Sequence, residues 1–257
     1  MRYRLPKKSK ISGIDKVIAV ASAKGGVGKS TISTNLAVAM SLSGRKVGLL
    51  DADIFGPSIP KMFNLFEKPY LSESTLNKLQ ISVKNDRKAF YSLEKLWFWR
   101  GLMVMKALQQ LIYDVDWGAL DLLVIDMPPG TGDTQLTIAQ QIILDGVVIV
   151  STPQDIALMD AIRGINMFRK MDIKILGVVE NMSVFVCPNC NYNTHIFGID
   201  GLKHVAKNMN IEVLANIPLH ENIVQDCEKG YPSVIADPNS PQSLSFRTLA
   251  NVIWEKL

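Results

Sequence analysis

The chain has 257 residues, of which 47% are apolar, and its formal net charge is +4. This length and composition suffice for one large domain, and the weak, evenly mixed charge gives no indication of a nucleic-acid partner. Three cysteines are too few for the disulfide framework of a secreted protein, so we expect a reducing compartment and a metal or redox role for them. No apolar run reaches the ~18 residues that a transmembrane helix requires, so we expect no stable membrane insertion.

The first ten residues are rich in Arg and Lys and contain no apolar signal core. We interpret them as a solvated basic tail; the alternative is that an initiating Met has replaced a cleaved transit peptide. The predicted organisation is a flexible basic segment over residues 1–15, followed by one domain over residues 16–257.

Short apolar runs without alternation alternate with stretches of helical periodicity along the chain. Apolar runs of this kind are typical of parallel strands buried on both faces, and parallel neighbours need crossover connections. The pattern therefore predicts an α/β fold, a mostly parallel sheet with helices on both faces. Residues 57–99 lack a sustained period and are predicted to form an excursion with loops. The predicted strands are residues 17–21, 46–50, 120–125, 146–151 and 173–179, and the predicted helices are residues 30–43, 101–114, 134–144 and 157–171.

A glycine-rich loop, residues 23–31, joins the first predicted strand to the first predicted helix. It departs from the P-loop pattern at one position, because Ala23 stands where that pattern has its first glycine. Its glycines allow a tight turn that aims backbone N–H groups at phosphate, and the helix adds its positive end. In such a loop the lysine contacts the β- and γ-phosphates and the following serine binds Mg²⁺. The residues predicted to bind ATP here are Gly25, Gly26, Val27, Gly28, Lys29, Ser30 and Thr31.

Carboxylates follow two of the predicted strands. Asp51 and Asp53 come after the second strand, and Asp126 follows the strand over residues 120–125. Carboxylates in these places hold Mg²⁺ and orient the attacking water, and Asp126 is predicted to be the Walker B acid. The turn over residues 128–130 is a predicted switch loop, in which Gly130 offers its N–H to the γ-phosphate. The predicted magnesium residues are Ser30, Asp53 and Asp126.

These motifs resemble the Mrp/Nbp35 branch of the deviant-Walker P-loop ATPases. The resemblance covers nearly the whole chain after Lys16, and residues 99–110 and 132–138 look most like the mitochondrial members, which are implicated in building the iron–sulfur clusters of respiratory complex I. Residues 69–96 depart from the family pattern. The matching motifs are residues 24–30, 51–58, 126–133, 181–183, 187–190, 195–198 and 217–219.

The resemblance implies roles for several residues. Lys24 is implied to reach across a homodimer interface to the partner's phosphates, and Asp53 to be the switch I acid that positions water, which makes these two the expected catalytic residues. Asn181 is implied to contact the purine, with the loop after Pro218 closing over the base.

Cys187 and Cys190 form one CxxC motif, in which Pro188 and Asn189 make the tight turn that lets both sulfurs face one metal. One pair is half of a four-ligand site, and a symmetric dimer would complete a Cys₄ set that suits either zinc or a 4Fe-4S cluster. The family favours the cluster; zinc and a thiol pair without metal remain alternatives.

Other candidate ligands are weaker. His195 is near enough in sequence to be the third ligand of a zinc knuckle, but no fourth ligand is evident. Cys227 is interpreted as structural, and His204 and His220 as ordinary polar residues.

The C-terminal residues 240–257 carry apolar side chains at near-helical spacing. A membrane-surface helix would be rich in cations, and this stretch has few, so we expect a helix docked on the core. The apolar positions are Leu244, Leu249, Val252, Ile253 and Leu257.

The sequence therefore predicts a slow ATPase that holds a 4Fe-4S cluster at a homodimer interface and delivers it to apo-proteins such as complex I subunits. The expected compartment is the mitochondrial matrix, with the cytoplasm as the alternative. Two other functions remain open, a positioning ATPase of the MinD or ParA type and a zinc-stabilised, nucleotide-dependent regulatory module. The first would need a basic amphipathic tail or a basic patch, and neither is evident.

Overall fold

The computed structural model describes residues 8–54, 56–65, 70–71, 79–80, 88–91, 102–187, 189–190 and 192–257. Residues 1–7 of the predicted basic segment lie outside these ranges, as do most of the predicted excursion over residues 57–99 and most of the divergent segment over residues 69–96.

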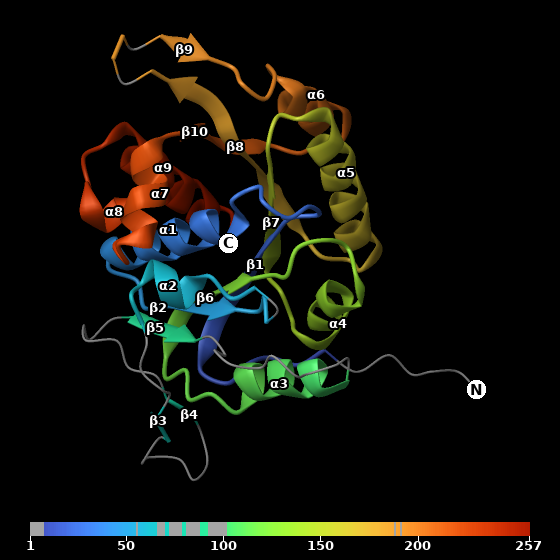
Figure 1. The fold of residues 1–257 in the computed structure, drawn as a ribbon. Coiled ribbons are helices and arrows are strands. Elements are labelled where there is room, and N and C mark those ends of the chain that lie inside the picture. Colours follow the sequence, from blue (N-terminus) through green and yellow to red (C-terminus); the bar gives the residue numbers. More distant parts are fainter. Residues whose placement is uncertain are drawn as a thin grey trace.

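The fold is built on one large, mostly parallel sheet, as the sequence predicts (Figure 1). Its strands are β1 (Ile14–Ala21), β2 (Val47–Asp51), β5 (Lys88–Tyr91), β6 (Leu120–Asp126), β7 (Gly146–Ser151), β8 (Ile175–Val186), β9 (Asn193–Thr194) and β10 (Val213–Leu219). They follow the order β10-β8-β7-β1-β6-β2-β5 with every neighbour parallel, and β9 pairs antiparallel with β8. A separate antiparallel pair joins β3 (Tyr70–Leu71) to β4 (Leu79–Gln80).

Helices cover both faces of this sheet (Figure 1). One face carries α1 (Lys29–Leu42), α2 (Ile59–Met62), α7 (Glu221–Glu228), α8 (Ser233–Ala236) and α9 (Pro241–Glu255). The other face carries α3 (Leu102–Tyr113), α4 (Asp133–Gln141), α5 (Asp155–Lys170) and α6 (Gly201–Asn208). The predicted three-layer α/β architecture is confirmed.

The central strand β1 divides its apolar side chains between the two cores. Ile18 and Val20 belong to the cluster under α1 and α9, whereas Val17 and Ala19 belong to the cluster under α3, α4 and α5. This alternation follows from the two-residue period of a strand, and it makes both faces of the sheet apolar. It also explains why the strand reads as a continuous apolar run.

The N-terminal boundary of the domain, predicted at residue 16, is wrong, because described residues before it are part of the fold. Ile11 and Ile14 are buried in the core, and Ser9 forms a parallel bridge with Ile142. Residues 9–15 therefore belong to the folded domain, because two isoleucines in a polar segment are enough to anchor it.

The strand predicted over residues 173–179 is shifted and much longer, since β8 runs from Ile175 to Val186. The polar pair Glu180 and Asn181 ends the apolar run, yet both side chains are buried inside the sheet. Directly after them Met182 has a φ of 57°, in the left-handed region, and the pairing of β8 with β10 shifts its register there. The strand thus bends between Asn181 and the cysteine motif.

The C-terminal helix α9 packs on the core, as predicted. Its buried face consists of Phe246, Leu249, Ala250 and Ile253, whereas Leu244 is 50% exposed and was assigned to the wrong face. Within the described residues, no helix combines the length and the apolar character that crossing a bilayer requires.

Candidate nucleotide site and cysteine pair

The glycine-rich loop connects β1 to α1 at the carboxyl edge of the sheet, where open α/β sheets bind ligands. Gly26 and Gly28 have φ angles of 78° and 80°, in the region that favours glycine. A Cβ atom on Gly28 would overlap the side-chain amide of Asn181, whereas Gly26 has open space around it. Gly28 caps α1 with no side-chain hydrogen bond, so the positive end of the helix faces the loop.

A cavity of about 210 Å³ lies in this loop. Most of the predicted phosphate-binding residues line it, together with Asp53. Pro129 of the predicted switch loop lines it as well. The side chain of Val27 is instead buried in the core, so this residue can offer only its backbone to a ligand. The cavity is lined by Ser22, Gly25, Gly26, Gly28, Lys29, Ser30, Thr31, Asp53, Met62 and Pro129.

Asp126 is the centre of a buried polar network. Its carboxylate lies 2.7 Å from the Lys29 ammonium and accepts hydrogen bonds from Ser30 Oγ at 2.6 Å and Ser33 Oγ at 2.9 Å. A buried ion pair is tolerated when further hydrogen bonds satisfy its oxygens, as they do here. Ser30 and Asp126 thereby place two hard oxygen ligands side by side, the type that Mg²⁺ prefers. Ser33 was missed, although its spacing of three from Ser30 on a helix was a usable signal.

Asp51 organises the loop that carries Asp53. Its carboxylate accepts the backbone N–H groups of Asp53, Ser58 and Ile59, each at 3.1 Å. Asp51 and Asp126 are register partners on neighbouring strands. Burial, and then this neighbouring carboxylate, raises the pKa of Asp51 to about 7.

Asp53 faces the cavity. Burial raises the pKa of its carboxyl group, and the nearby Lys29 ammonium opposes that effect. Of these two acids at the end of β2, Asp51 therefore holds the backbone of the following loop, while the Asp53 carboxyl is the one that a ligand in the cavity can reach.

The predicted switch loop is tied to the end of β1. The N–H of Gly130, predicted to bind the γ-phosphate, donates to the carbonyl of Ser22 at 2.9 Å. The buried side chain of Gln135 donates to the same carbonyl at 3.2 Å and to the carbonyl of Pro128. Gln135 was not singled out from the sequence, where it is one polar residue among several in α4. A phosphate contact by Gly130 stays a prediction and requires its bond to Ser22 to open.

Lys24, Asn181 and Pro218 are among the predicted residues that do not line the cavity. Asn181 donates from its amide to the carbonyl of Val27 at 2.8 Å and so supports the loop from the neighbouring strand. Pro218 lies in β10 and does not line the cavity. The Lys24 ammonium has no hydrogen bond or ion pair to any residue that the structure describes. Their predicted roles toward the base and toward a partner's phosphates stay predictions.

The cysteine motif follows directly on β8. The N–H of Cys187 donates to the carbonyl of Tyr192 at 3.0 Å, and β9 pairs back on β8 through Phe185 and Thr194. Cys187 is half-buried and Cys190 is exposed. The backbone N–H groups of Asn189 and Cys190 point at the Cys187 sulfur, and with the Cys190 thiol they lower its pKa. A lowered thiol pKa favours the thiolate form that binds metal, so the pair fits a thiophilic ligand.

The described residues of one chain do not complete a metal site. Among the described residues no group of three or more His, Cys, Asp and Glu side chains could hold a metal ion. His195 Nδ1 lies 3.2 Å from the carbonyl of Ser183, a contact that metal-bound and metal-free histidines both make, so the zinc-knuckle alternative stays a prediction. Cys227 is buried in α7, and burial raises its pKa to about 11, in agreement with a structural role.

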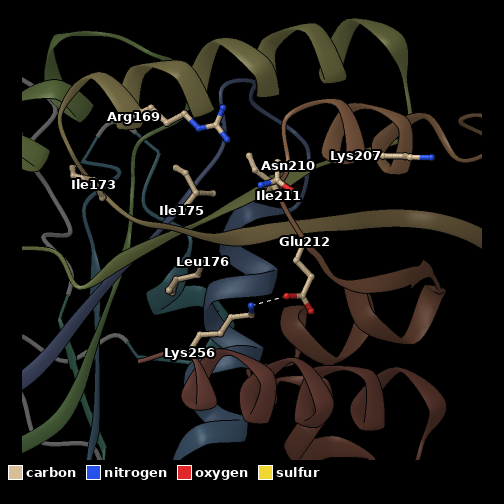
Figure 2. Close-up of a pocket in the computed structure, with 9 residues that line it drawn as sticks. All are labelled: Arg169, Ile173, Ile175, Leu176, Lys207, Asn210, Ile211, Glu212 and Lys256. Atoms are coloured by element: carbon tan, nitrogen blue, oxygen red, sulfur yellow. Dashed lines mark hydrogen bonds and ion pairs between the residues drawn. The ribbon is translucent and has the colours of Figure 1, made fainter.

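A second cavity, of about 620 Å³, lies at the opposite end of β8 (Figure 2). Lys256 pairs with Glu212 across it at 2.6 Å, and Arg169 donates to the carbonyl of Met209 at 2.6 Å. Arg169 and Lys256 lie at the carboxyl ends of α5 and α9, where cations are favourable without any ligand. None of the predicted site residues lines it, so it is separate from the loop cavity.

The strand–loop–helix geometry and the strand-end carboxylate bonded to the loop lysine and serine are those of a P-loop NTPase. Comparison with protein families makes the assignment narrower. The model of the ParA group described as "NUBPL iron-transfer P-loop NTPase" matches residues 13–254, and the chain belongs to this family.

Curated relatives match along almost the whole chain. The iron-sulfur cluster transfer protein NUBPL of Mus musculus is 49% identical over 100% of this chain and 82% of its own length. The iron-sulfur protein required for NADH dehydrogenase, mitochondrial, of Arabidopsis thaliana is 47% identical over 95% of this chain and 80% of its own. The iron-sulfur cluster carrier protein of Escherichia coli K12 is 43% identical over 99% and 70%.

Solved structures share the fold. The nucleotide-binding protein of Archaeoglobus fulgidus, in complex with ADP, superposes with a TM-score of 0.78 at 36% identity, covering 91% of this chain and 92% of that one. The cell division ATPase MinD of Pyrococcus furiosus superposes with a TM-score of 0.73 at 22% identity, covering 94% and 99%, and at that identity it bears on the fold alone.

Proposed function

We propose that this protein is an ATP-hydrolysing iron–sulfur cluster carrier. It acts as a homodimer that holds a 4Fe-4S cluster between two Cys187–Cys190 pairs and delivers it to apo-proteins, among them subunits of respiratory complex I, in the mitochondrial matrix. The names of the relatives support the cargo, the recipient and the compartment, and the cytoplasm is the alternative location.

One observation carries the proposal: strand β8 belongs to both sites. Asn181 in this strand bonds the carbonyl of Val27 in the nucleotide loop, and Cys187 follows the last residue of the same strand. A nucleotide loop and a pair of thiols suited to metal are thus connected through one strand.

The residues of the cavity divide the work of ATP hydrolysis. On nucleotide binding, the Lys29 ammonium leaves the Asp126 carboxylate and contacts the β- and γ-phosphates. The glycine N–H groups and the start of α1 bind the remaining phosphate oxygens. Mg²⁺ would be held by Ser30 and Asp126, directly or through water, with Asp53 close by, and it neutralises developing charge on the phosphates. Asp53 orients the attacking water.

Lys24 and the cysteine motif both require a second copy. The Lys24 side chain is half-buried and has no hydrogen bond or ion pair among the described residues, so its ammonium is available to a partner's phosphates. One CxxC supplies two of the four thiolates that hold a 4Fe-4S cluster, so two copies complete the set.

Anaerobic reconstitution with iron and sulfide tests the proposal. We expect the parent to take up about four iron and four sulfide per dimer, as a Cys₄-bound 4Fe-4S cluster requires. The variant with Cys187→Ala and Cys190→Ala should take up neither. Cys227→Ala is the matched control, since it removes the third cysteine and should leave uptake unchanged. Equal iron and sulfide in the double variant and the parent would refute the carrier function, and zinc without sulfide in the protein as purified would favour the zinc alternative.

A further inference from the structure

The cavity at the end of β8 opposite the cysteine motif is the larger of the two, with a volume of about 620 Å³ against about 210 Å³ in the nucleotide loop. Small-molecule sites typically have volumes of ~300 to 1,000 Å³. The lining comes from the end of α5, the start of β8, the chain between α6 and β10, and Lys256 after α9. The fold thus forms a second concave surface of ligand size that the proposed function does not use.

One part of the lining is apolar. Ile173 and Leu176 are 5% and 3% exposed, and the half-buried Ile175 and Ile211 line the cavity with them. Contact with such a wall removes the apolar surface of a ligand from water, which is favourable. The wall therefore favours a ligand with an apolar body.

The charged part of the lining has three cations and one carboxylate. Arg169 lies in the last turn of α5, Lys207 in the last turn of α6, and Lys256 follows α9. Each position is favourable by itself, because the carboxyl end of a helix carries partial negative charge. Their convergence on one cavity is less favourable, because a cavity of this volume is about as wide as the Debye length of ~10 Å, so the cations on its walls repel one another. A bound anion would relieve that repulsion.

Glu212 neutralises one of these cations and leaves two. Its carboxylate pairs with the Lys256 ammonium at 2.6 Å. Arg169 makes one hydrogen bond, to the carbonyl of Met209, although a guanidinium has five N–H donors. The Lys207 ammonium has no hydrogen bond or ion pair to any residue that the structure describes. The charge that remains available to a ligand is therefore positive, on Arg169 and Lys207.

Figure 2 shows how the apolar and the charged groups are arranged. Ile175 lies between the Arg169 side chain and the Lys256–Glu212 pair. A ligand whose apolar body contacts Ile175 thus has its polar end within reach of Arg169. A planar guanidinium binds a carboxylate through two parallel N–H donors, which adds geometric specificity to the charge.

We propose that this cavity binds a small amphipathic anion, an organic carboxylate with an apolar body. The carboxylate binds the Arg169 guanidinium, with the Lys207 ammonium close by, and the apolar body packs on Ile175 and on the buried side chains next to it. The inference goes beyond the proposed function and does not rest on it, because the cavity lining contains none of the described residues predicted to bind nucleotide or metal.

Octanoate is the probe, and octylammonium is the matched probe of opposite charge. Isothermal titration calorimetry on the full chain measures their binding at low salt. We expect one octanoate to bind per chain, and octylammonium to bind at least ~10-fold more weakly. Arg169→Gln with Lys207→Gln should weaken octanoate binding at least ~10-fold, because the charge-assisted contacts to the carboxylate are lost. The matched control, Lys170→Gln with Lys229→Gln, removes two exposed lysines outside the lining and should bind octanoate as the parent does.

Three results would overturn the inference: no saturable binding of octanoate by the parent, octylammonium bound as tightly as octanoate, or equal affinity for octanoate in the parent and the double variant. Each of them leaves the carrier function standing, since iron and sulfide uptake tests that function separately.

Arg169 also bonds the chain after α6 through the Met209 carbonyl, so its replacement affects more than a ligand. Should the double variant fold poorly by circular dichroism, Lys207→Glu applies the same test with Arg169 in place. It reverses one charge at the cavity and should weaken octanoate binding at least ~10-fold. Unchanged octanoate affinity in Lys207→Glu would also overturn the inference.

Discussion

Lys29 and Asp126 form an ion pair of 2.7 Å in which both side chains are buried. The loop lysine is therefore held by the strand-end carboxylate, which also accepts the hydroxyl groups of Ser30 and Ser33. Phosphate binding has to replace one buried charge interaction by another, so nucleotide affinity depends directly on this lysine.

Replacing Lys29 by alanine is expected to weaken ATP binding by at least ~100-fold, because a charge-assisted contact to phosphate contributes about 3 kcal/mol. Isothermal titration with ATP and Mg²⁺ measures the change. The matched control is Lys229→Ala, an exposed lysine beyond α7. Unchanged ATP binding and turnover in Lys29→Ala would remove the phosphate assignment.

The two left-handed glycines of the loop make a matched pair. Alanine at position 28 meets the Asn181 amide and an unfavourable φ, whereas alanine at position 26 meets only the unfavourable φ. We expect Gly26→Ala to cost about 1 kcal/mol in unfolding free energy and Gly28→Ala about 2 to 3 kcal/mol. Urea unfolding without nucleotide measures both, and equal losses would contradict the close approach of Asn181 to the loop.

Gln135 joins the end of β1 to the switch loop through the carbonyls of Ser22 and Pro128. Its replacement by alanine should lower the turnover number at least ~10-fold with little change in ATP affinity, because the buried amide positions the predicted switch loop and does not line the cavity. Steady-state kinetics with Gln140→Ala, a neighbouring glutamine in α4, as control gives the comparison. A loss of affinity without a loss of turnover would show that Gln135 acts on binding instead.

Cys227 predicts a pH dependence of stability. Burial raises its pKa to about 11, above the ~8.5 of an unfolded thiol. The folded chain therefore binds more protons than the unfolded chain between these values, so this thiol makes unfolding free energy fall as pH rises from about 9 to 11. Thermal unfolding of Cys227→Ala should show a smaller decline than the parent over that range. An identical decline would mean that the thiol titrates normally.

The nucleotide loop was predictable because it is local. Residues 23–31 are consecutive, and their glycines and the helix that follows are recognisable in the sequence itself. The place of Asp126 was also predictable, since carboxylates that end neighbouring parallel strands meet at one edge, and Asp51 and Asp126 are indeed register partners. The predicted order of strands and helices followed from the apolar runs, which are also local features of the sequence.

Contacts between distant segments could not be predicted from these patterns. Asn181 forms a hydrogen bond with Val27, which lies 154 residues away in the sequence. The residues around either position do not predict that bond. Strand β10 was not predicted because Asn216 and Pro218 interrupt its apolar run. Its burial results from contact with α9, which the local pattern does not reveal. In α9 the buried face includes Phe246. The spacing of the leucines and isoleucines alone did not identify that face.

The bend at Met182 has a geometric consequence for the two chemical centres. Six steps of chain separate Asn181, which supports the phosphate loop, from Cys187, a path of roughly 20 Å at the usual rise of a strand. A residue other than glycine at a φ of 57° costs energy to hold, which the surrounding sheet must supply. Replacing Met182 by glycine would relax the backbone at this position and leave Asn181 and Cys187 unchanged. The variant would therefore show the effect of the stiffness of this segment at constant length.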